Sequence, residues 1–87
     1  MNVKKDKMDL VKTELENLVG ITRTEEGCIN YDLYQDNENP GSLMLYEKWE
    51  SRELWQNHMA KQHLKDYKTA TEGAFESSAL KEMTQIV

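Results

Sequence analysis

The chain has 87 residues, of which 38% are hydrophobic and 31% charged, and its formal net charge is −5 at pH 7. This length predicts one domain over residues 1–87 with a small core, for which pairing with a second copy is a reasonable source of added stability. The acidic charge argues against binding to nucleic acid, and no apolar run approaches the ~20 residues that span a membrane, so neither partner is expected.

An amphipathic helix is predicted first. Apolar residues recur at intervals of three and four between Lys7 and Thr22, which is the spacing of one helix face. Gly27 then makes a backbone turn available. In CINYDLYQ (28–35) and SLMLYEKW (42–49) the period changes to two, which is typical of strands, and the DNENPG between them is dense in turn residues. These two segments predict a β-hairpin.

Alternation divides the side chains of each strand between two faces. In the first strand, one face holds Ile29, Tyr31 and Leu33, and the other holds Cys28, Asn30, Asp32 and Tyr34. In the return strand, one face holds Leu43, Leu45, Glu47 and Trp49, and the other holds Met44, Tyr46 and Lys48. The carboxylate of Glu47 stands among apolar neighbours, so it must find a partner or reach the edge of the layer.

Two more helices and a strand are predicted after the hairpin. Ser51 is a good N-cap residue for a helix. The inner stripe of that helix is Leu54, Trp55, His58 and Met59. A second helix has apolar or small residues at helical spacing, namely Leu64, Tyr67, Ala70, Thr71, Ala74 and Phe75. The tail ALKEMTQIV is prone to β-structure at its end and predicts a final strand.

The resulting order, a hairpin followed by a helical crossover, is similar to a ferredoxin-like α+β fold, an antiparallel sheet with helices on one face. In that fold a first strand precedes the first helix. Only Met1-Asn2-Val3 is available before the charged residues 4–7, whereas strands usually run ~5–6 residues. The first strand is therefore expected to be truncated.

Chemically active groups are concentrated in WESRELWQNHMAKQHLKDY (49–67). His58 and His63 are five residues apart, so they would point about 140° apart on one continuous helix, whereas chelating pairs prefer a spacing of four. A helix break at Lys61-Gln62 would relax this objection, but no Cys or Asp stands at ligand spacing nearby, and no metal site is expected.

Cys28 follows two glutamates, which raise a thiol pKa and disfavour a nucleophile. As the only cysteine, it also favours a reducing cytoplasm.

The aromatic residues leave two interpretations open. Trp49, Trp55, Tyr67 and Phe75 are either the core between helices and sheet or, together with the histidines, the wall of an apolar ligand pocket. His63, in the predicted break between two helices, is the better functional candidate. His58, on the inner stripe of its helix, is better explained as a core histidine than as a site residue.

At this point the chain resembles the antibiotic biosynthesis monooxygenase family, and within it the quinol monooxygenase branch. The resemblance rests on EEGCINYDLYQD and LYEKWESRELWQNHMAKQHLKDY and covers Glu25 to Tyr67. It implies a ferredoxin-like monomer that pairs into a dimeric α+β barrel, with Met44 and Tyr46 facing the partner sheet. It also implies cofactor-independent oxidation of a quinol or related phenol by O₂. A histidine titrates near neutral pH and is a sensible base for such a substrate.

Residue by residue, the resemblance gives a set of expected site residues. His58 and His63 match the common histidines of the quinol branch, with His63 expected as the base. Trp49 matches a pocket tryptophan, Trp55 replaces a tyrosine, and Leu45 replaces an asparagine. Tyr67, as a supporting residue, and Glu47, which shares a strand face with Trp49, complete the expected substrate-binding set. Haem degradation is disfavoured, because Lys68 and His58 stand where haem-degrading relatives have an axial histidine and a tryptophan.

Two other functions remain open at this stage. One is a dimeric small-molecule-binding or stress-response module that does not turn its ligand over. The other is an isomerase, because one fold hosts many chemistries.

Overall fold

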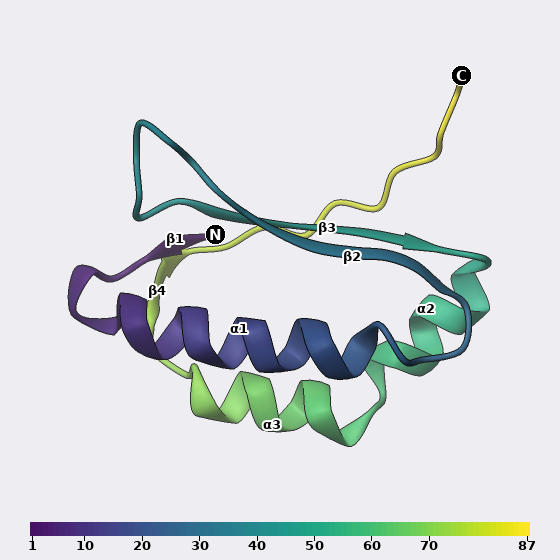
Figure 1. Ribbon diagram of the computed structural model, residues 1–87, viewed down its shortest axis with the longest axis horizontal. Coiled ribbons are helices and arrows are strands. Elements are labelled where there is room, and N and C mark those ends of the chain that lie inside the picture. Colours follow the sequence, from purple (N-terminus) through teal and green to yellow (C-terminus); the bar gives the residue numbers. More distant parts are fainter.

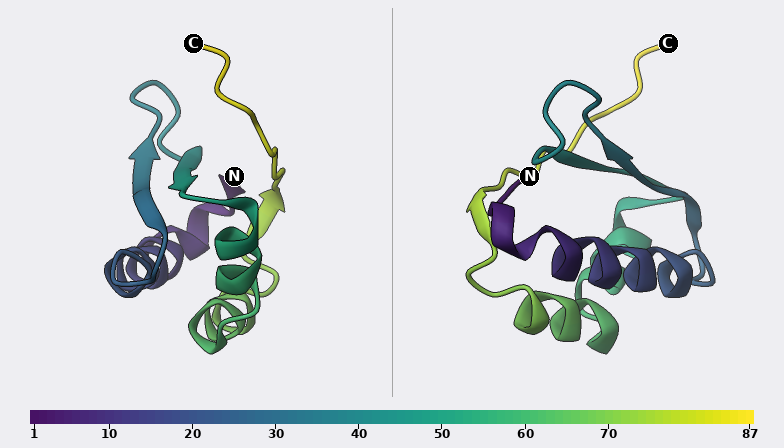
Figure 2. Two further views of the ribbon diagram at one scale, coloured as in Figure 1. Left: turned by 90° about the vertical axis from the view of Figure 1, so that its right-hand side faces the viewer. Right: turned by 60° about the vertical axis from the view of Figure 1, so that its left-hand side comes forward.

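The computed structural model describes residues 1–87 as an α+β chain with its three α-helices on one side of the strands (Figures 1 and 2). The elements are β1 (Asn2–Val3), a 3₁₀ turn η1 (Lys5–Lys7), α1 (Met8–Thr22), β2 (Cys28–Gln35), β3 (Leu43–Trp49), α2 (Arg52–Met59), α3 (Gln62–Ala70) and β4 (Phe75–Ser77). The first strand is as short as predicted. None of the helices combines the length and the hydrophobicity that a membrane crossing requires.

The strands form two antiparallel ladders, β1–β4 and β2–β3. Backbone hydrogen bonds join the ladders, since the amide of Leu43 donates to Met1 O at 2.9 Å and the Met1 amino group donates to Leu43 O at 2.8 Å. Asn2 and Ser42 add a single bridge. These contacts place the strands in the order β2, β3, β1, β4. Because β1 is so short, the edge of β3 from Leu45 to Trp49 has no strand beside it.

The core lies between α1, α3 and the inner face of the hairpin. The buried face of α1 repeats every three to four residues, with Val11, Leu15 and Leu18 at most 3% exposed, as the sequence predicted. α3 runs back alongside α1 (Figure 1) and contributes the buried Leu64. Burying one such side chain contributes about 1.5–3 kcal/mol, so this small set supplies much of the stability of the fold.

A β-bulge corrects the predicted faces at the start of the hairpin. Cys28 pairs with Trp49 and Asn30 pairs with Lys48, so Ile29 is an extra residue opposite no partner. The prediction put Ile29 on the same face as Tyr31, but Ile29 is 51% exposed and Cys28 packs against the core. A one-residue insertion moves a side chain to the other face because the strand repeats every two residues. Beyond Asn30 the predicted alternation holds.

The second predicted helix and the final strand have different bounds from those expected. α3 ends at Ala70, Gly73 adopts a φ of 75° in the turn that follows, and Phe75 begins β4 instead of continuing the helix. The final strand was expected in the tail, yet residues 78–87 have no regular secondary structure. A strand needs a neighbouring edge for its backbone hydrogen bonds. β1 offers only two residues, so the ladder stops early.

Gly27 closes the loop between α1 and β2, and we expect it to be essential for stability. Its φ is 85°, and a Cβ atom there would lie 2.4 Å from Leu54 Cδ1. Gly27→Ala combines a left-handed backbone penalty with overpacking, so the free energy of unfolding should fall by about 2–4 kcal/mol. Chemical denaturation measures this change.

The matched control is Gly20→Ala. Gly20 lies within α1, and a Cβ atom there meets nothing within 4 Å. Alanine at this exposed helical position should stabilise the protein by about 0.5–1 kcal/mol. Equal destabilisation by the two substitutions would contradict the backbone argument.

Candidate functional site

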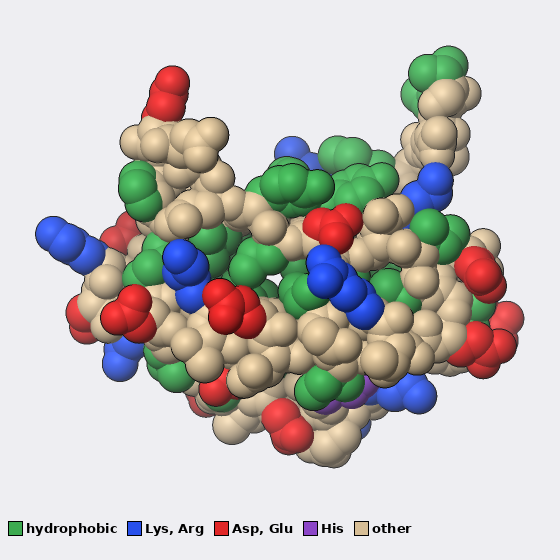
Figure 3. Space-filling model, viewed as in Figure 1, with side chains coloured by type: hydrophobic (Ala, Val, Ile, Leu, Met, Phe, Trp, Pro, Cys, Tyr) green, Lys and Arg blue, Asp and Glu red, His purple; other side chains and the backbone are tan.

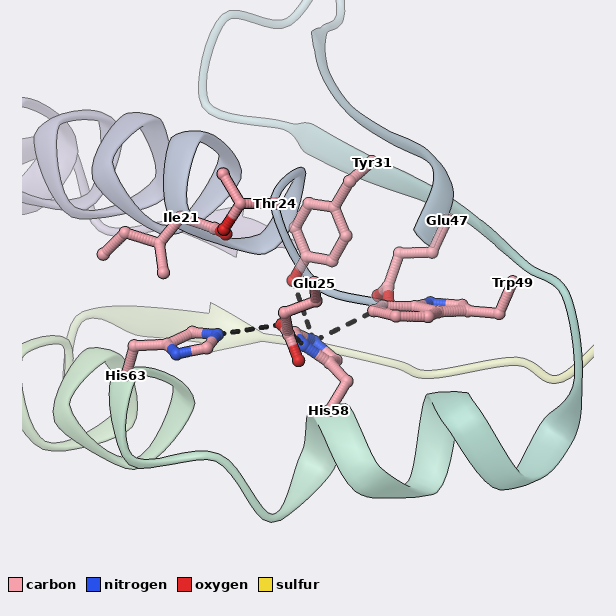
Figure 4. A network of polar contacts seen from close by, with 8 residues as sticks. All are labelled: Ile21, Thr24, Glu25, Tyr31, Glu47, Trp49, His58 and His63. Carbon is pink, nitrogen blue, oxygen red and sulfur yellow. Dashed lines mark hydrogen bonds and ion pairs between the residues drawn. The ribbon is translucent and has the colours of Figure 1, made fainter. Parts of the chain in front are cut away.

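Polar groups gather where the loop between α1 and β2 meets the junction of α2 and α3. Glu25 lies in that loop, His58 is near the end of α2, and His63 is in the first turn of α3. α2 ends at Met59, and Lys61 has extended backbone angles, φ −71° and ψ 148°, so the helix direction changes between the histidines. Both imidazoles therefore reach one carboxylate from two different helices (Figure 4).

Oε2 of Glu25 accepts a hydrogen bond from each histidine. The distance is 2.6 Å to His58 Nδ1 and 2.9 Å to His63 Nε2. Because an ionised carboxylate only accepts hydrogen bonds, both of these ring nitrogens carry a hydrogen. The side chains of His58, Glu25 and His63 are 1%, 10% and 20% exposed. In the neutral form, this leaves Nε2 of His58 without a hydrogen and able to accept a proton.

The Nε2 side of His58 faces a second polar set from the hairpin. The hydroxyl of Tyr31 lies 3.4 Å from Nε2, and Oε1 of Glu47 lies 3.9 Å from it. Trp49 covers the imidazole with its ring centroid 4.8 Å away, and its Nε1–H donates to Glu47 Oε1 at 3.1 Å. Glu47 therefore finds its partners inside the site, and His58 lies between two carboxylates (Figure 4).

The phenols around the site stay protonated. Burial, reinforced by the charge of Glu47, raises the pKa of Tyr31 far above its ordinary value. Burial also raises the pKa of Tyr67. Neither hydroxyl is therefore a base near neutral pH, and both are hydrogen-bond donors. Burial and then the charge of Glu25 raise the pKa of the Cys28 thiol, as the sequence predicted, which disfavours a catalytic thiolate.

A cavity of about 350 Å³ lies beside this network, with lining residues from β3, α3 and β4. Binding sites for small molecules have volumes of about 300–1,000 Å³. Nine of the sixteen residues that line this cavity are hydrophobic, and Tyr31, Glu47 and His58 bring polar groups to its wall. The cavity thus combines a mainly apolar wall with a few polar groups, which is typical of small-molecule sites.

The structure divides the expected site residues into two groups. The cavity wall includes His58, Leu45, Glu47 and Tyr67. His63 and Trp49 do not line it, but they contact groups that do, through Glu25 and through the ring of His58. Trp55 joins neither set, because it lies beneath the guanidinium of Arg52, whose Cζ is 5.8 Å from the ring centroid.

Glu25 and Tyr31 were not among the residues predicted for the site, although both contact His58. Both belong to the segment EEGCINYDLYQD that carried the family resemblance. An acidic residue beside a turn glycine and an aromatic residue on a strand each look structural when considered alone. The motif itself was the available signal.

Glu25, His58 and His63 are also the residues that could hold a metal ion. One ligand atom from each lies within 4.8 Å of the other two. No metal site was expected from the sequence, because the histidine spacing is unfavourable on a continuous helix and no further ligand stands nearby in the sequence. The break between α2 and α3 removes that argument, and the third donor comes from a distant loop.

Comparisons with known proteins give one consistent family. The chain is 32% identical over 63 residues to "Putative monooxygenase Rv0793" of Mycobacterium tuberculosis, an alignment that covers 72% of this chain and 61% of that protein. The chain therefore spans about three fifths of the length of this curated relative. The chain is also 29% identical to sll1783 of Synechocystis, an alignment that covers 40% of the length of that protein.

Solved structures match the fold over most of the chain. Rv0793 superposes with a TM-score of 0.83 at 25% identity, over 98% of this chain and 90% of that one. A conserved protein from Methanosarcina mazei has a TM-score of 0.83 at 28% identity, over 88% and 76%. PA3566 from Pseudomonas aeruginosa has a TM-score of 0.92 at 21% identity, over 100% and 88%. These likenesses confirm the predicted ferredoxin-like α+β fold.

The sequence profile of antibiotic biosynthesis monooxygenases matches residues 1–70. This range includes β1, the hairpin, all three helices and every residue of the Glu25–His58–His63 cluster. The chain belongs to the antibiotic biosynthesis monooxygenase family.

Proposed function

We propose that the protein oxidises a quinol or related phenol with O₂ and without an organic cofactor. The observation that carries this proposal is the placement of His58. Its Nδ1–H is held by Glu25 at 2.6 Å, and its ring contributes to the wall of an apolar cavity. A histidine whose Nδ1–H is held by a carboxylate and whose ring borders a ligand cavity has the arrangement of a general base.

In the proposed reaction, Nε2 of His58 accepts the proton of the substrate hydroxyl. The family resemblance predicted His63 in this role, but His63 lies on the far side of Glu25 and does not line the cavity. Once Nε2 carries the proton, Glu47 Oε1, 3.9 Å away, is positioned to stabilise the imidazolium. Tyr31 stays protonated and donates a hydrogen bond to the substrate oxygen. His63 is a positioning residue that acts through Glu25.

The substrate anion supplies the electrons. An electron-rich phenolate or quinolate reduces O₂ directly, and the largely hydrophobic wall of the cavity suits its apolar ring. For a quinol, one oxygen atom of O₂ enters the ring to give a hydroxyquinone. The other oxygen atom leaves as water, together with two of the hydrogens of the quinol. The part played by the protein is to bind, orient and deprotonate.

The proposal includes a homodimer formed through the outer face of the hairpin. Tyr34, Met44 and Tyr46 lie on the face away from the helices and are 51%, 56% and 47% exposed. Hydrophobic side chains are visible along this upper side of the molecule in Figure 3. Exposed aromatic and methionine side chains in one patch mark an interface between proteins.

The proposed compartment is the cytoplasm, where the free thiol of Cys28 would stay reduced.

The test is O₂ consumption by the purified protein with a panel of reduced benzoquinones and naphthoquinones, followed by mass analysis of products formed under ¹⁸O₂. The expected result is uptake above the rate without protein and a product that carries one labelled oxygen atom. A ligand that binds and is recovered unchanged would instead make the protein a binding module. A rearranged product without label would make it an isomerase.

A further inference from the structure

Glu25 and His63 position His58 in the proposed oxidation, and the same three side chains are also suited to a second role. We propose that Glu25, His58 and His63 together bind one divalent transition-metal ion. The ligand atoms are Oε2 of Glu25, Nδ1 of His58 and Nε2 of His63, contributed by the α1–β2 loop, α2 and α3.

The geometry requires a moderate rearrangement of the side chains. The three ligand atoms lie within 4.8 Å of one another, and both nitrogens already approach the same oxygen, at 2.6 and 2.9 Å. Around a tetrahedral ion with bonds of about 2.0–2.1 Å, neighbouring ligand atoms are about 3.3 Å apart. Nδ1 of His58 and Nε2 of His63 therefore move away from the oxygen by about 0.7 and 0.4 Å, and the two nitrogens, which lie within 4.8 Å, approach each other by up to about 1.5 Å. The ion then replaces the two ring hydrogens that His58 and His63 donate to Glu25.

The donor set selects the class of ion. Two imidazoles and one carboxylate suit Zn²⁺, Fe²⁺ and Co²⁺, whereas Ca²⁺ and Mg²⁺ prefer oxygen ligands throughout. Three protein ligands leave at least one coordination position open for water or a small anion. The ring of His58 is further held by Trp49 and Tyr31, with ring centroids 4.8 and 5.3 Å away. Such packing fixes the orientation of a metal-binding imidazole.

The cluster has its own route to solvent. A second cavity of about 80 Å³ adjoins Glu25 and is lined by Glu25, Glu26, Leu54, Asn57 and Lys61. It includes no residue of the substrate cavity, so an ion could enter without passing through that cavity. Glu26 attracts a cation there and Lys61 opposes it, so the two charges nearly offset each other. His63 reaches the surface with 20% of its side chain exposed, and histidine atoms are visible as a small patch in Figure 3.

Metal binding has a consequence for the proposed oxidation, and this consequence rests on that proposed function. An ion on Nδ1 of His58 leaves the one hydrogen of a neutral imidazole on Nε2. Nε2 then donates, toward Glu47 or Tyr31, and no longer accepts the proton of a substrate. A bound ion is therefore expected to inhibit turnover, which makes the cluster a regulatory site for the same histidine.

The test of binding is a titration of the metal-free full chain with Co²⁺, followed by displacement with Zn²⁺. The expected result is a saturable ligand-field absorption with one ion per chain, lost on addition of one equivalent of Zn²⁺. His63→Ala and Glu25→Gln should each weaken binding by at least about a hundredfold, because removal of even an outer partner of a metal ligand costs 10–100-fold. Glu53→Gln, which removes one exposed carboxylate from α2, should bind like the wild type.

Circular dichroism and thermal unfolding show whether each variant folds, and His63→Ala is the decisive variant because its side chain is the least buried of the three. Absence of a saturable absorption in the folded wild type overturns the proposal. Equal Co²⁺ affinity in wild type and folded His63→Ala also overturns it. The readout needs no substrate, so a protein that binds Co²⁺ yet oxidises no quinol refutes the proposed function alone.

Discussion

His58→Gln is expected to lower kcat/KM for quinol oxidation by about 10²–10⁴-fold, the usual contribution of a general base. Glutamine keeps a hydrogen-bonding group beside Tyr31 and Glu47, which lie 3.4 and 3.9 Å from Nε2 in the wild type. It cannot accept the substrate proton. The loss should fall mainly on kcat, because the apolar wall that binds the ring is unchanged. Initial rates of O₂ uptake over a range of quinol concentrations measure both constants.

His63→Gln provides the matched comparison, because it removes the other imidazole from the same oxygen of Glu25. This residue acts on the base only through Glu25, so the expected loss is about tenfold or less. Glu53→Gln on the exposed side of α2 should keep the wild-type rate. If His63→Gln loses activity by three orders of magnitude while His58→Gln stays active, the base is His63 and the proposed assignment of roles is wrong.

Met44→Glu combined with Tyr46→Glu is expected to convert a dimer into monomers. Both side chains are about half exposed, on the outer face of β3. In the proposed dimer, the two substitutions would bury two carboxylates from each copy against the sheet of the partner. Each chain already carries a net charge of −5, which adds to the repulsion. Central interface residues commonly contribute about 2 kcal/mol or more each, so the dissociation constant should rise at least about a thousandfold.

Light scattering at micromolar concentration measures the mass of both proteins. The matched control is Leu10→Glu, which places a carboxylate at a 40% exposed apolar residue of α1, on the helical side of the molecule. This variant should remain a dimer. A wild-type protein that is monomeric at micromolar concentration would contradict the proposed interface, and so would a dimer that survives the paired substitution in β3.

The main elements could be predicted from the sequence because each depends on local periodicity. The three- to four-residue spacing in α1 and the alternation in β2 and β3 reflect one buried face, and the structure confirms both. Ser51 caps α2 as predicted, its Oγ accepting the amide hydrogen of Leu54 at 3.2 Å. Such signals need only neighbouring residues. They located the hairpin, the helices and the segment that carries both histidines.

Other features depend on contacts between distant segments, and no local pattern encodes them. The bulge at Ile29 follows from the register of β2 against β3, and the length of β4 follows from the two residues of β1. The strand predicted in the tail failed for the same reason, because a β-prone segment remains irregular where no strand edge is free to pair with it.

The candidate site shows this division most clearly. The sequence alone identified His58 and His63, but their spacing of five residues misplaces them on a straight helix, and no third ligand stands nearby in the sequence. The tertiary structure breaks that helix at Ala60-Lys61 and brings Glu25, 33 residues before His58, to within 2.6 Å of its ring. Identity and spacing of residues determine which groups are available. Packing of α2 and α3 against the α1–β2 loop decides which of them meet, because side-chain convergence depends on the relative orientation of whole elements.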